Sequence, residues 1–565
     1  MDELQVLKET EAFGKLTDTR CHLLIDHMID VAACFTRLAK CRSIHRALNE
    51  TAGRELTDLD IARLAVLAFM HDIGKANSGF QAKRWKTRIP PNWPVPITAG
   101  HGVEAIALFQ VDTAAAALEP LIEKVCTWGQ AVDSLLAASI SHHGRPIKER
   151  PGVSLSIWKS YNGKYDPAVV LKEAAVCAQV FFPEAFKVGG LPLPDAPHFG
   201  HLFAGVVQLA DWLGSDIRFF RYSEAGENRA ERAHILADEA ISTLGLDCDD
   251  WRAKLIAVAP NFADVFGGYD PRPVQAAMND DSLGPLVILE SETGSGKTEA
   301  ALWRYVHLFR AGLVDSLYFA LPTRVAATQL YQRVQDTLKR LWPENPPLAL
   351  RALPGYVAAD GEEIKAMANF EVFWNDSPDD QKAHQRWAAE NSKRFLAAPV
   401  AVGTIDQVLL GALQVRHAHL RHATLARSLL VVDEVHASDA YMTVLLERLL
   451  KAHLGCGGHA LLLSATLGSG ARSRYLALAP TGQSGLIRNM SFEQACAVPY
   501  PAISDCHGIR ATPGTGRSKR VGWSARDCIA APEKIAQLAI EAAAQGAKVL
   551  IIRNTVPAAV ATLNA

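Results

Sequence analysis

The stretch Leu286–Ala301, LVILESETGSGKTEAA, constrains the fold of this chain more than any other segment. Its first four residues, Leu286–Leu289, are apolar and predict a buried parallel strand. Gly294–Gly296 then predict a tight turn, and a helix is expected from Lys297 to about Gly312. A strand, a glycine turn and a helix N-terminus form an anion site, because backbone N–H groups and the helix dipole point at one place.

This arrangement predicts a nucleoside triphosphate site. Lys297 would reach the β- and γ-phosphates, and the Thr298 hydroxyl would bind Mg²⁺. Ser291 stands where the usual pattern has its first glycine, so the strict motif is missed by one residue. Further along, Asp433 ends an apolar run and would hold Mg²⁺, while Glu434 would orient and deprotonate the attacking water. A pair of carboxylates that caps a helix is the alternative for these two residues.

Length and composition set the broad class of the chain. Its 565 residues are too many for one core and suggest about three domains. The formal net charge is −2, so any contact with nucleic acid must be local. The acidic N-terminus is unlike a secretory signal, and no apolar run approaches the ~20 residues that span a membrane. Ten cysteines without a CxxC pair fit reduced thiols. We therefore expect a cytoplasmic protein with no membrane contact.

The apolar pattern changes once along the chain. From residue 1 to about 235 it is helical throughout, which predicts an all-α domain. Residues 236–270 are a predicted linker. Residues 271–485 alternate short apolar strands with helices, which predicts a parallel α/β sheet with helices on both faces. The expected strands are Leu286–Leu289, Leu317–Leu321, Val400–Gly403, Leu429–Val432 and Leu461–Leu463. Residues 486–530 are an irregular connector, and 531–565 contain a predicted strand, Val549–Ile552, that starts another α/β unit.

The second half resembles the superfamily 2 helicases. The matching segments are Pro273–Gln275 (the adenine-reading glutamine motif), Leu321–Arg324 (motif Ia), Gly403–Gln407 (Ib), the DEVH box Asp433–His436 (II), Ser464–Thr466 (III) and Ile551–Thr555 (IV, which begins a second RecA-like domain). The resemblance implies that ATP and Mg²⁺ are bound by Gln275, Thr293, Gly294, Ser295, Gly296, Lys297, Thr298, Asp433 and Glu434. It also implies that coupling or DNA contact is made by Thr323, Arg324, Thr404, Gln407, His436, Ser464 and Thr466.

The family's remaining motifs, including the arginine fingers of motif VI, follow motif IV, where this sequence stops. We therefore expect a C-terminally truncated member that binds Mg-ATP but hydrolyses it slowly alone, because an arginine finger is worth ~10³–10⁵ in rate.

Histidines and aspartates recur in or beside apolar helices of the first half. They are His27, His71, Asp72, His101, His142, His143 and Asp211. All can point into one bundle core, where imidazoles and carboxylates would repel one another unless a metal were present. The set suffices for two ions that share one carboxylate, which suits phosphodiester hydrolysis. Nitrogen-rich ligation favours Mn²⁺, Fe²⁺, Co²⁺ or Ni²⁺ here, whereas the all-oxygen helicase site favours Mg²⁺.

The order of these residues is similar to that of the HD phosphohydrolase superfamily. Fused to a DEVH helicase, it resembles the CRISPR-associated helicase-nuclease of type I interference systems. The resemblance implies one metal on His27, His71, Asp72 and Asp211, and a second on Asp72, His101, His142 and His143. Asp72, Lys75 and Glu434 would be catalytic, with Lys75 steadying the scissile phosphate unless it is a solvated helix-end lysine.

The function implied by this resemblance is CRISPR interference. The protein would be a monomer that a guide-RNA surveillance complex recruits to target DNA. The HD domain would cut single-stranded DNA as an endonuclease or exonuclease. The ATP-dependent helicase would pull the DNA toward the nuclease. Two other readings stay open: an HD nucleotide phosphohydrolase on an unrelated ATPase, and an ATP- and DNA-binding module without helicase turnover.

Overall fold

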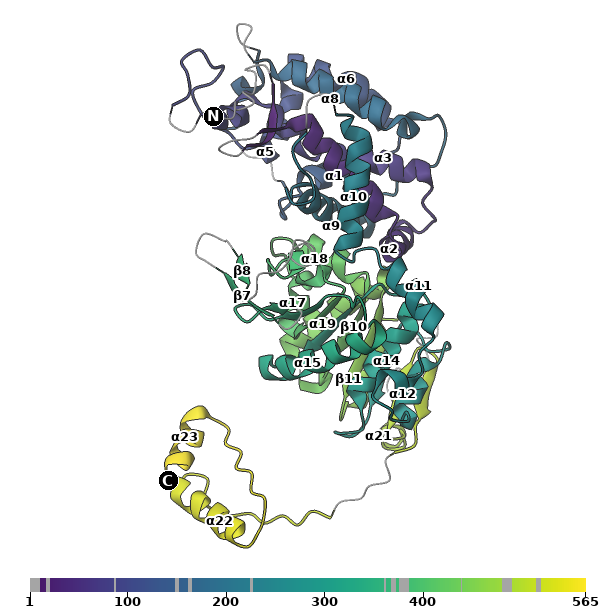
Figure 1. Cartoon of the computed structure of the whole chain (residues 1–565), viewed down its shortest axis with the longest axis vertical. Coiled ribbons are helices and arrows are strands. Elements are labelled where there is room, and N and C mark those ends of the chain that lie inside the picture. Colours follow the sequence, from purple (N-terminus) through teal and green to yellow (C-terminus); the bar gives the residue numbers. More distant parts are fainter. Residues whose placement is uncertain are drawn as a thin grey trace. The chain divides into compact units, whose positions relative to one another are not determined.

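The computed structural model describes residues 11–16, 21–85, 88–147, 152–160, 165–223, 227–359, 362–366, 372–374, 386–437, 439–479, 490–514 and 520–565. The chain divides into two compact units, Met1–Gly514 and Thr515–Ala565. Figure 1 shows that the first unit contains a helical half, built from the residues up to Thr243, and a half organised around a β-sheet.

The helical half is built mainly from α-helices, which confirms the predicted all-α class. Its α-helices are α1 (Leu24–Ala39), α2 (Arg42–Ala52), α3 (Asp58–Phe69), α4 (Ser78–Gln81), α5 (Gly102–Ala107), α6 (Asp112–Cys126), α7 (Val132–Ile140), α8 (Pro167–Phe181), α9 (Pro197–Gly214) and α10 (Arg229–Thr243). A 3₁₀ helix, η1 (Met70–Ala76), continues directly from α3. The start of α3 is fixed by Thr57 and Asp60, whose side chains each accept a hydrogen bond from the other's backbone N–H.

The expectation of helix throughout this half is wrong at its start, where β1 (Phe13–Leu16) and β2 (Cys21–Leu23) form an antiparallel pair. The Gln81 side chain acts like a neighbouring strand: its Oε1 accepts from the Phe13 N–H at 2.9 Å and its Nε2 donates to the Phe13 carbonyl at 3.0 Å. Such a side-chain partner leaves no periodic signal in the sequence.

The second half contains an 11-stranded sheet, as far as the described residues go, in the order β13-β12-β3-β11-β10-β4-β9-β5-β6-β7-β8. The strands are β3 (Leu286–Glu290), β4 (Ser316–Leu321), β5 (Ala349–Ala352), β6 (Ala358–Ala359), β7 (Glu362–Ala366), β8 (Val372–Trp374), β9 (Val400–Thr404), β10 (Ser428–Val432), β11 (His459–Ser464), β12 (Ala502–Asp505) and β13 (Gly508–Ala511). All five strands predicted between residues 271 and 485 are confirmed, and β3 to β5 pair in parallel through β11, β10, β4 and β9.

The expected parallel strands form the centre of the sheet, and antiparallel strands at both edges make the sheet as a whole mixed. β12 and β13 add antiparallel strands beside β3, and β6, β7 and β8 add them beside β5. These edge strands are short, and β12 is joined to β13 by only Cys506 and His507, a connection that antiparallel pairing permits and parallel pairing does not.

Helices cover both faces of the sheet, as expected. The α-helices described in this half are α11 (Asp249–Val258), α12 (Phe262–Val265), α13 (Pro273–Ala276), α14 (Lys297–Arg310), α15 (Arg324–Leu341), α17 (Ile405–Leu409), α18 (Ala418–Leu425), α19 (Ala440–Gly455), α20 (Ser469–Leu476) and α21 (Phe492–Cys496). The predicted linker, residues 236–270, contains the end of α10 and the whole of α11 and α12.

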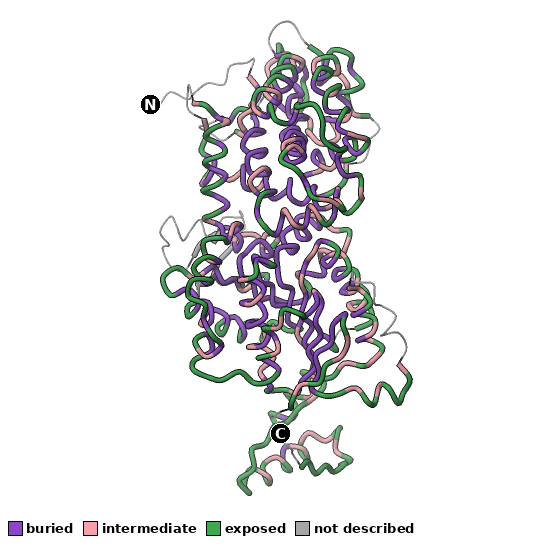
Figure 2. The backbone as a smooth tube through the Cα atoms, turned by 90° about the vertical axis from the view of Figure 1, so that its right-hand side faces the viewer, coloured by how far each residue is buried: buried purple, intermediate pink, exposed green. Residues whose placement is uncertain are grey.

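Side chains alternate between two cores along each central strand, as the two-residue period of a strand requires. Val287 and Leu289 pack with α14 and α15, whereas Leu286 and Ile288 belong to a core that continues into the helical half. Figure 2 shows this buried interior running through both halves of the first unit. The helical half and the sheet-containing half are therefore joined by shared packing.

The second unit contains α22 (Pro532–Ala544) and α23 (Val556–Asn564). The strand predicted at Val549–Ile552 is wrong, because these four residues belong to no strand and their side chains are exposed. A strand needs neighbours for its backbone hydrogen bonds, and the described residues of this unit supply none.

Among the described residues, no individual helix has the length and apolar character to cross a membrane. One pair, Gly102–Gln110 with Asp112–Cys126, meets those criteria only when taken together, and it is bent by 97°.

Candidate metal centre and nucleotide site

Five segments of the helical half bring the predicted ligands into one place. His27 lies on α1, His71 and Asp72 on η1, and Asp211 on α9, and all four side chains are buried. His101 directly precedes α5, while His142 and His143 lie in the turn that follows α7. These helices are apolar on the faces they bury, so packing them in one core turns their few polar side chains toward each other.

The first group surrounds the Asp72 Oδ2 atom. The Nε2 atoms of His27 and His71 each lie 3.1 Å from it, and they lie 3.7 and 3.8 Å from Asp211 Oδ1. One ligand atom from each of the four residues fits within 4.8 Å of the others. This spacing matches four ligands around one ion.

The second group lies on the other oxygen of the same carboxylate. The Asp72 Oδ1 atom is 3.3 Å from His101 Nε2 and 3.5 Å from His142 Nε2, and His143 Nε2 is 2.6 Å from His101 Nε2. His101, His142 and His143 also place one ligand atom each within 4.8 Å. Asp72 therefore stands between two sets of imidazoles, with one oxygen turned to each.

The hydrogen bonds of this cluster suit divalent cations. His71 Nδ1 lies 2.9 Å from the Ala68 carbonyl and His142 Nδ1 lies 3.1 Å from that of Ser139, which leaves each Nε2 free to bind a metal. The Nε2 atoms of His27 and His71 and the Oδ1 atom of Asp72 are buried and make no hydrogen bond. Buried polar atoms without a partner are costly, and two ions would satisfy all three.

The electrostatics also suit metal binding, since ligands must be neutral imidazoles and ionised carboxylates. Burial lowers the pKa of His27 well below its usual range, that of His101 to about 3 and that of His142 to about 4. Burial acts to raise the pKa of Asp72, but Lys75 and His71 outweigh it and hold that pKa well below the ordinary value.

Lys75 belongs to the same cluster. Its Nζ atom lies 2.5 Å from Asp72 Oδ2 and donates to the Gly14 carbonyl at 3.2 Å. The residue is 9% exposed, so the reading as a solvated helix-end lysine does not fit. Gly74 lets η1 approach the segment of His101 closely, because a Cβ there would lie 1.8 Å from the His101 carbonyl oxygen.

Three supporting residues were not anticipated from the sequence. Ser215 donates to Asp211 Oδ1 at 3.0 Å and so orients that carboxylate. Asp30, one turn after His27, accepts two hydrogen bonds from Arg229 on α10 at 2.8 and 2.7 Å. The i, i+4 spacing of Asp211 and Ser215 on a helix could have predicted their hydrogen bond. Asp30 and Arg229 are far apart in the sequence, so no local pattern predicts their contact.

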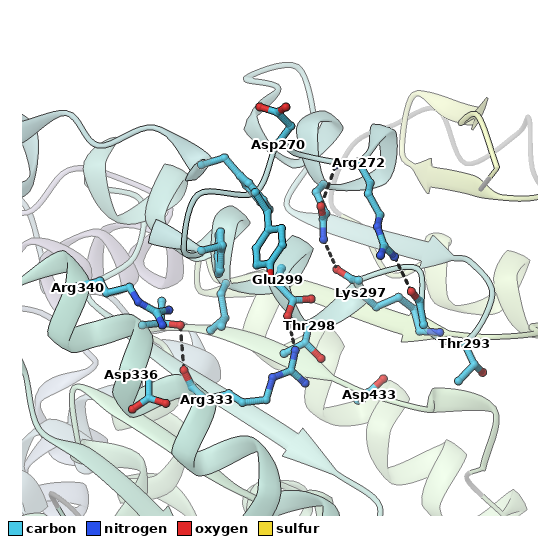
Figure 3. A pocket seen from close by; sticks show the side chains of 18 of the residues that line it. Asp270, Arg272, Thr293, Lys297, Thr298, Glu299, Arg333, Asp336, Arg340 and Asp433 are labelled. Atoms are coloured by element: carbon cyan, nitrogen blue, oxygen red, sulfur yellow. Dashed lines mark hydrogen bonds and ion pairs between the residues drawn. The ribbon is translucent and has the colours of Figure 1, made fainter. Parts of the chain in front are cut away.

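The predicted nucleotide residues line a second site. A cavity of about 690 Å³ is bordered by Gln275, Thr293, Gly294, Gly296, Lys297, Thr298, Asp433 and Glu434, among others. Ser295 is buried in the same loop. Figure 3 shows Lys297, Thr298 and Asp433 directed toward the same space. The volume lies in the range of small-molecule and cofactor sites.

The glycine turn is held by side chains from the segment before β3. Gln275 Nε2 donates to the Gly296 carbonyl at 3.2 Å, and Arg272 donates to the Gly294 carbonyl. Lys297 Nζ donates to the Ser291 carbonyl at 2.8 Å. Burial, followed by the charge of Glu434, raises the pKa of Asp433. A bound cation would reverse that effect, because it favours the ionised carboxylate.

The DEVH box is connected to the following motif. His436 Nδ1 lies 3.0 Å from Ser464 Oγ, and that oxygen accepts from the Thr466 N–H at 3.1 Å. Sequence reasoning missed Glu290, at the end of β3, which accepts from the Leu467 N–H at 3.1 Å and from Arg472 Nε at 2.6 Å. Motif III is thus tied to both the phosphate loop strand and the DEVH segment.

The four residues predicted to contact DNA through motifs Ia and Ib do not form one hydrogen-bonded group in the described chain. Thr323 caps α15 by accepting from the Ala326 N–H at 3.2 Å, and Arg324 is exposed beside it. Thr404 is 8% exposed at the end of β9, and Gln407 is half-buried on α17.

Comparison with known proteins matches each half of the first unit to an established family. Residues 13–220 match the model of the Cas3 HD domain, and residues 272–473 match that of the DEAD/DEAH box helicase. A CRISPR-associated endonuclease/helicase Cas3 from Thermus thermophilus is 31% identical over 486 residues, which are 79% of this chain and 48% of that protein. The corresponding protein of Escherichia coli is 29% identical over 483 residues, 79% of this chain and 52% of that protein.

The chain therefore spans about half the length of the curated relatives it matches. A similar fold occurs in a solved "CRISPR RNA-guided surveillance complex, pre-nicking". The match has a TM-score of 0.57 and 20% identity, and it covers 96% of this chain and 61% of the other.

Proposed function

This chain joins a Cas3-type HD domain to a DEAD/DEAH box helicase domain and so belongs with the CRISPR-associated helicase-nucleases, and we propose that it cuts single-stranded DNA at its metal centre. The observation that carries the proposal is the position of Asp72, with one oxygen toward His27 and His71 and the other toward His101 and His142.

In this proposal His27, His71, Asp72 and Asp211 hold one divalent ion, and Asp72, His101, His142 and His143 hold the other. When bound, two such ions activate water and steady the departing oxygen of a phosphodiester. The chain's own residues keep the imidazoles neutral by burial and orient Asp211 through Ser215. Lys75 adds a positive charge within reach of a phosphate bound beside Asp72. Five imidazoles favour Mn²⁺, Fe²⁺, Co²⁺ or Ni²⁺.

The helicase half would bind Mg-ATP in its cavity. Lys297 and the glycine turn suit the phosphates, Thr298 and Asp433 suit Mg²⁺, and Glu434 suits the attacking water. The links from Ser464 to His436 and from Glu290 to Arg472 offer a route by which the nucleotide site could influence DNA contacts. Recruitment by a guide-RNA surveillance complex is proposed from the names of the relatives and of the structural neighbour.

Digestion of a circular single-stranded DNA tests this function, because a nucleotide phosphohydrolase would leave the circle intact. We expect EDTA to abolish cutting, and Mn²⁺ or Ni²⁺ to restore it better than Mg²⁺. Release of phosphate from free nucleotides with no cutting of the circle would contradict the proposal and favour the nucleotidase reading. Full activity in Mg²⁺ alone, with no transition metal found by elemental analysis, would contradict the histidine-rich centre.

A further inference from the structure

One segment of the helicase half contacts the turn that carries part of the metal centre. His417, which precedes α18, donates from its backbone N–H to the Gly144 carbonyl at 3.1 Å. Gly144 directly follows His142 and His143, two of the three histidines of the second group. A displacement of this turn would therefore move two predicted ligands at once.

The same histidine also contacts the helix that carries Asp211. The rings of His417 and Trp212 pack edge to face, with centroids 5.3 Å apart and planes inclined by 67°. Trp212 is the residue after Asp211, and it is also covered by the Arg394 guanidinium of the helicase half at 4.8 Å. His417 thus lies between a segment of the first metal group and a segment of the second.

The backbone at this contact is held in unusual conformations. His417 has φ +63°, in the left-handed backbone region that residues other than glycine rarely adopt. Gly144 has φ +86°, and a Cβ at that position would lie 2.6 Å from the His417 nitrogen and 2.8 Å from its Nδ1. His417 is only 7% exposed, and its Nδ1 is buried without a hydrogen-bond partner. Strained, buried geometry of this kind persists where the surrounding structure fixes it, often at functional sites.

We propose that His417 is a positioning residue through which the helicase half fixes the relative placement of the two metal groups. It acts through Gly144 on the His142–His143 turn and through Trp212 on the end of α9. The inference rests on the proposed function, because it concerns the same metal centre. It adds that the centre is completed by packing from the other half of the protein.

The test compares His417→Gly with His417→Phe in the full chain. The glycine variant keeps the N–H donor and suits the left-handed backbone but removes the ring, whereas phenylalanine keeps a ring against Trp212. We expect His417→Gly to weaken binding of the second Mn²⁺ by ~10–100-fold, the range for residues that orient ligands. The electron paramagnetic resonance signal of a coupled Mn²⁺ pair should fade with it, and cutting of circular single strands should slow, while nucleotide binding stays unchanged. His417→Phe should stay close to the wild type in all of these.

Arg46→Met is the matched control, because Arg46 also links the two halves, through the Gly312 carbonyl at 3.4 Å, and lies on α2, a helix that carries no predicted ligand. Equal weakening of Mn²⁺ binding in Arg46→Met would overturn the inference, since general loosening would then explain the effect. Normal binding of two ions by His417→Gly would also overturn it. If that variant does not fold, His417→Asn, which also tolerates a left-handed backbone, makes the same comparison. Absence of metal binding and cutting in the wild type would overturn the proposed function itself.

Discussion

Asp72 shows how far residue types can carry a prediction. The His-Asp pair and four further histidines are visible in the sequence, and apolar helices around them indicate that they converge. One oxygen of Asp72 faces His71 and the other faces His101. This arrangement depends on how η1 packs against its neighbours, which no local sequence pattern predicts. The sequence predicts Lys75 as a phosphate contact, but its bond to the Gly14 carbonyl depends on the antiparallel pair β1–β2, which helical periodicity does not predict.

Asp72→Asn should remove metal from both groups. The amide keeps the size of the carboxylate but loses the charge that two cations would share. Even an orienting residue is worth about 10–100-fold in metal affinity, so we expect Mn²⁺ affinity to fall by more than ~100-fold at both sites. Calorimetric titration without nucleotide should give two ions per chain for the wild type and fewer than one for the variant.

The control for this titration is Asp133→Asn, which removes an exposed carboxylate from α7, the helix that leads to the His142–His143 turn. Its stoichiometry should stay at two. Unchanged binding by Asp72→Asn would show that Asp72 does not bridge two ions.

At the scale of elements, the strands and the phosphate-loop helix follow closely from the sequence. Runs such as Leu429–Val432 are buried on both sides and are bounded by polar residues, so their type and position are well defined. The edge strands β12 and β13 are short and lack such a signal. The partner of α9 was also not predictable, because an apolar helix can pack against any apolar face; in the structure α9 packs against α18 of the helicase half.

This α9–α18 contact contains neutral histidines. His201 Nδ1 lies 3.2 Å from His422 Nδ1, and the His201 ring packs against that of His419 with centroids 4.1 Å apart. Burial lowers the pKa of His201 to about 3 and that of His422 to about 4. A histidine in the unfolded chain titrates near 6.5. Between about pH 6.5 and 4, the unfolded chain therefore binds protons that the folded protein does not, and stability falls as the pH is lowered.

His201→Gln should therefore reduce the loss of thermal stability between pH 7 and pH 5. The melting temperature of the wild type should fall over this interval, and that of the variant should fall less, because one buried base has been removed. His198→Gln, an exposed histidine on the same helix, should follow the wild type. An equal fall in all three proteins would show that the buried pair does not set this pH dependence.

At the scale of the whole molecule, the proposed metal centre and the proposed nucleotide site use different residues. The proposed metal centre draws its side chains from α1, η1 and α9, from the residue before α5 and from the turn after α7, whereas the nucleotide cavity uses the segment before β3, the phosphate loop and the end of β10. Yet one hydrophobic core extends from the helical half to one face of the sheet. Sequence periodicity predicted the two halves as separate patterns and could not reveal this continuity, which depends on side chains more than 200 residues apart.

The separation of the two sites predicts that cutting of single strands needs no ATP. Lys297→Ala removes the phosphate-binding cation but leaves every residue of the metal centre in place, so cutting should continue near the wild-type rate. Asp72→Ala should have the opposite effect, with cutting lost and nucleotide binding kept.

The most direct measurement is cleavage of a circular single-stranded DNA in Mn²⁺ without ATP by the wild type, Lys297→Ala and Asp72→Ala. We predict that the first two linearise and degrade the circle at similar rates and that Asp72→Ala leaves it intact. Loss of cutting in Lys297→Ala equal to that in Asp72→Ala, or continued cutting by Asp72→Ala, would contradict a metal nuclease centred on Asp72.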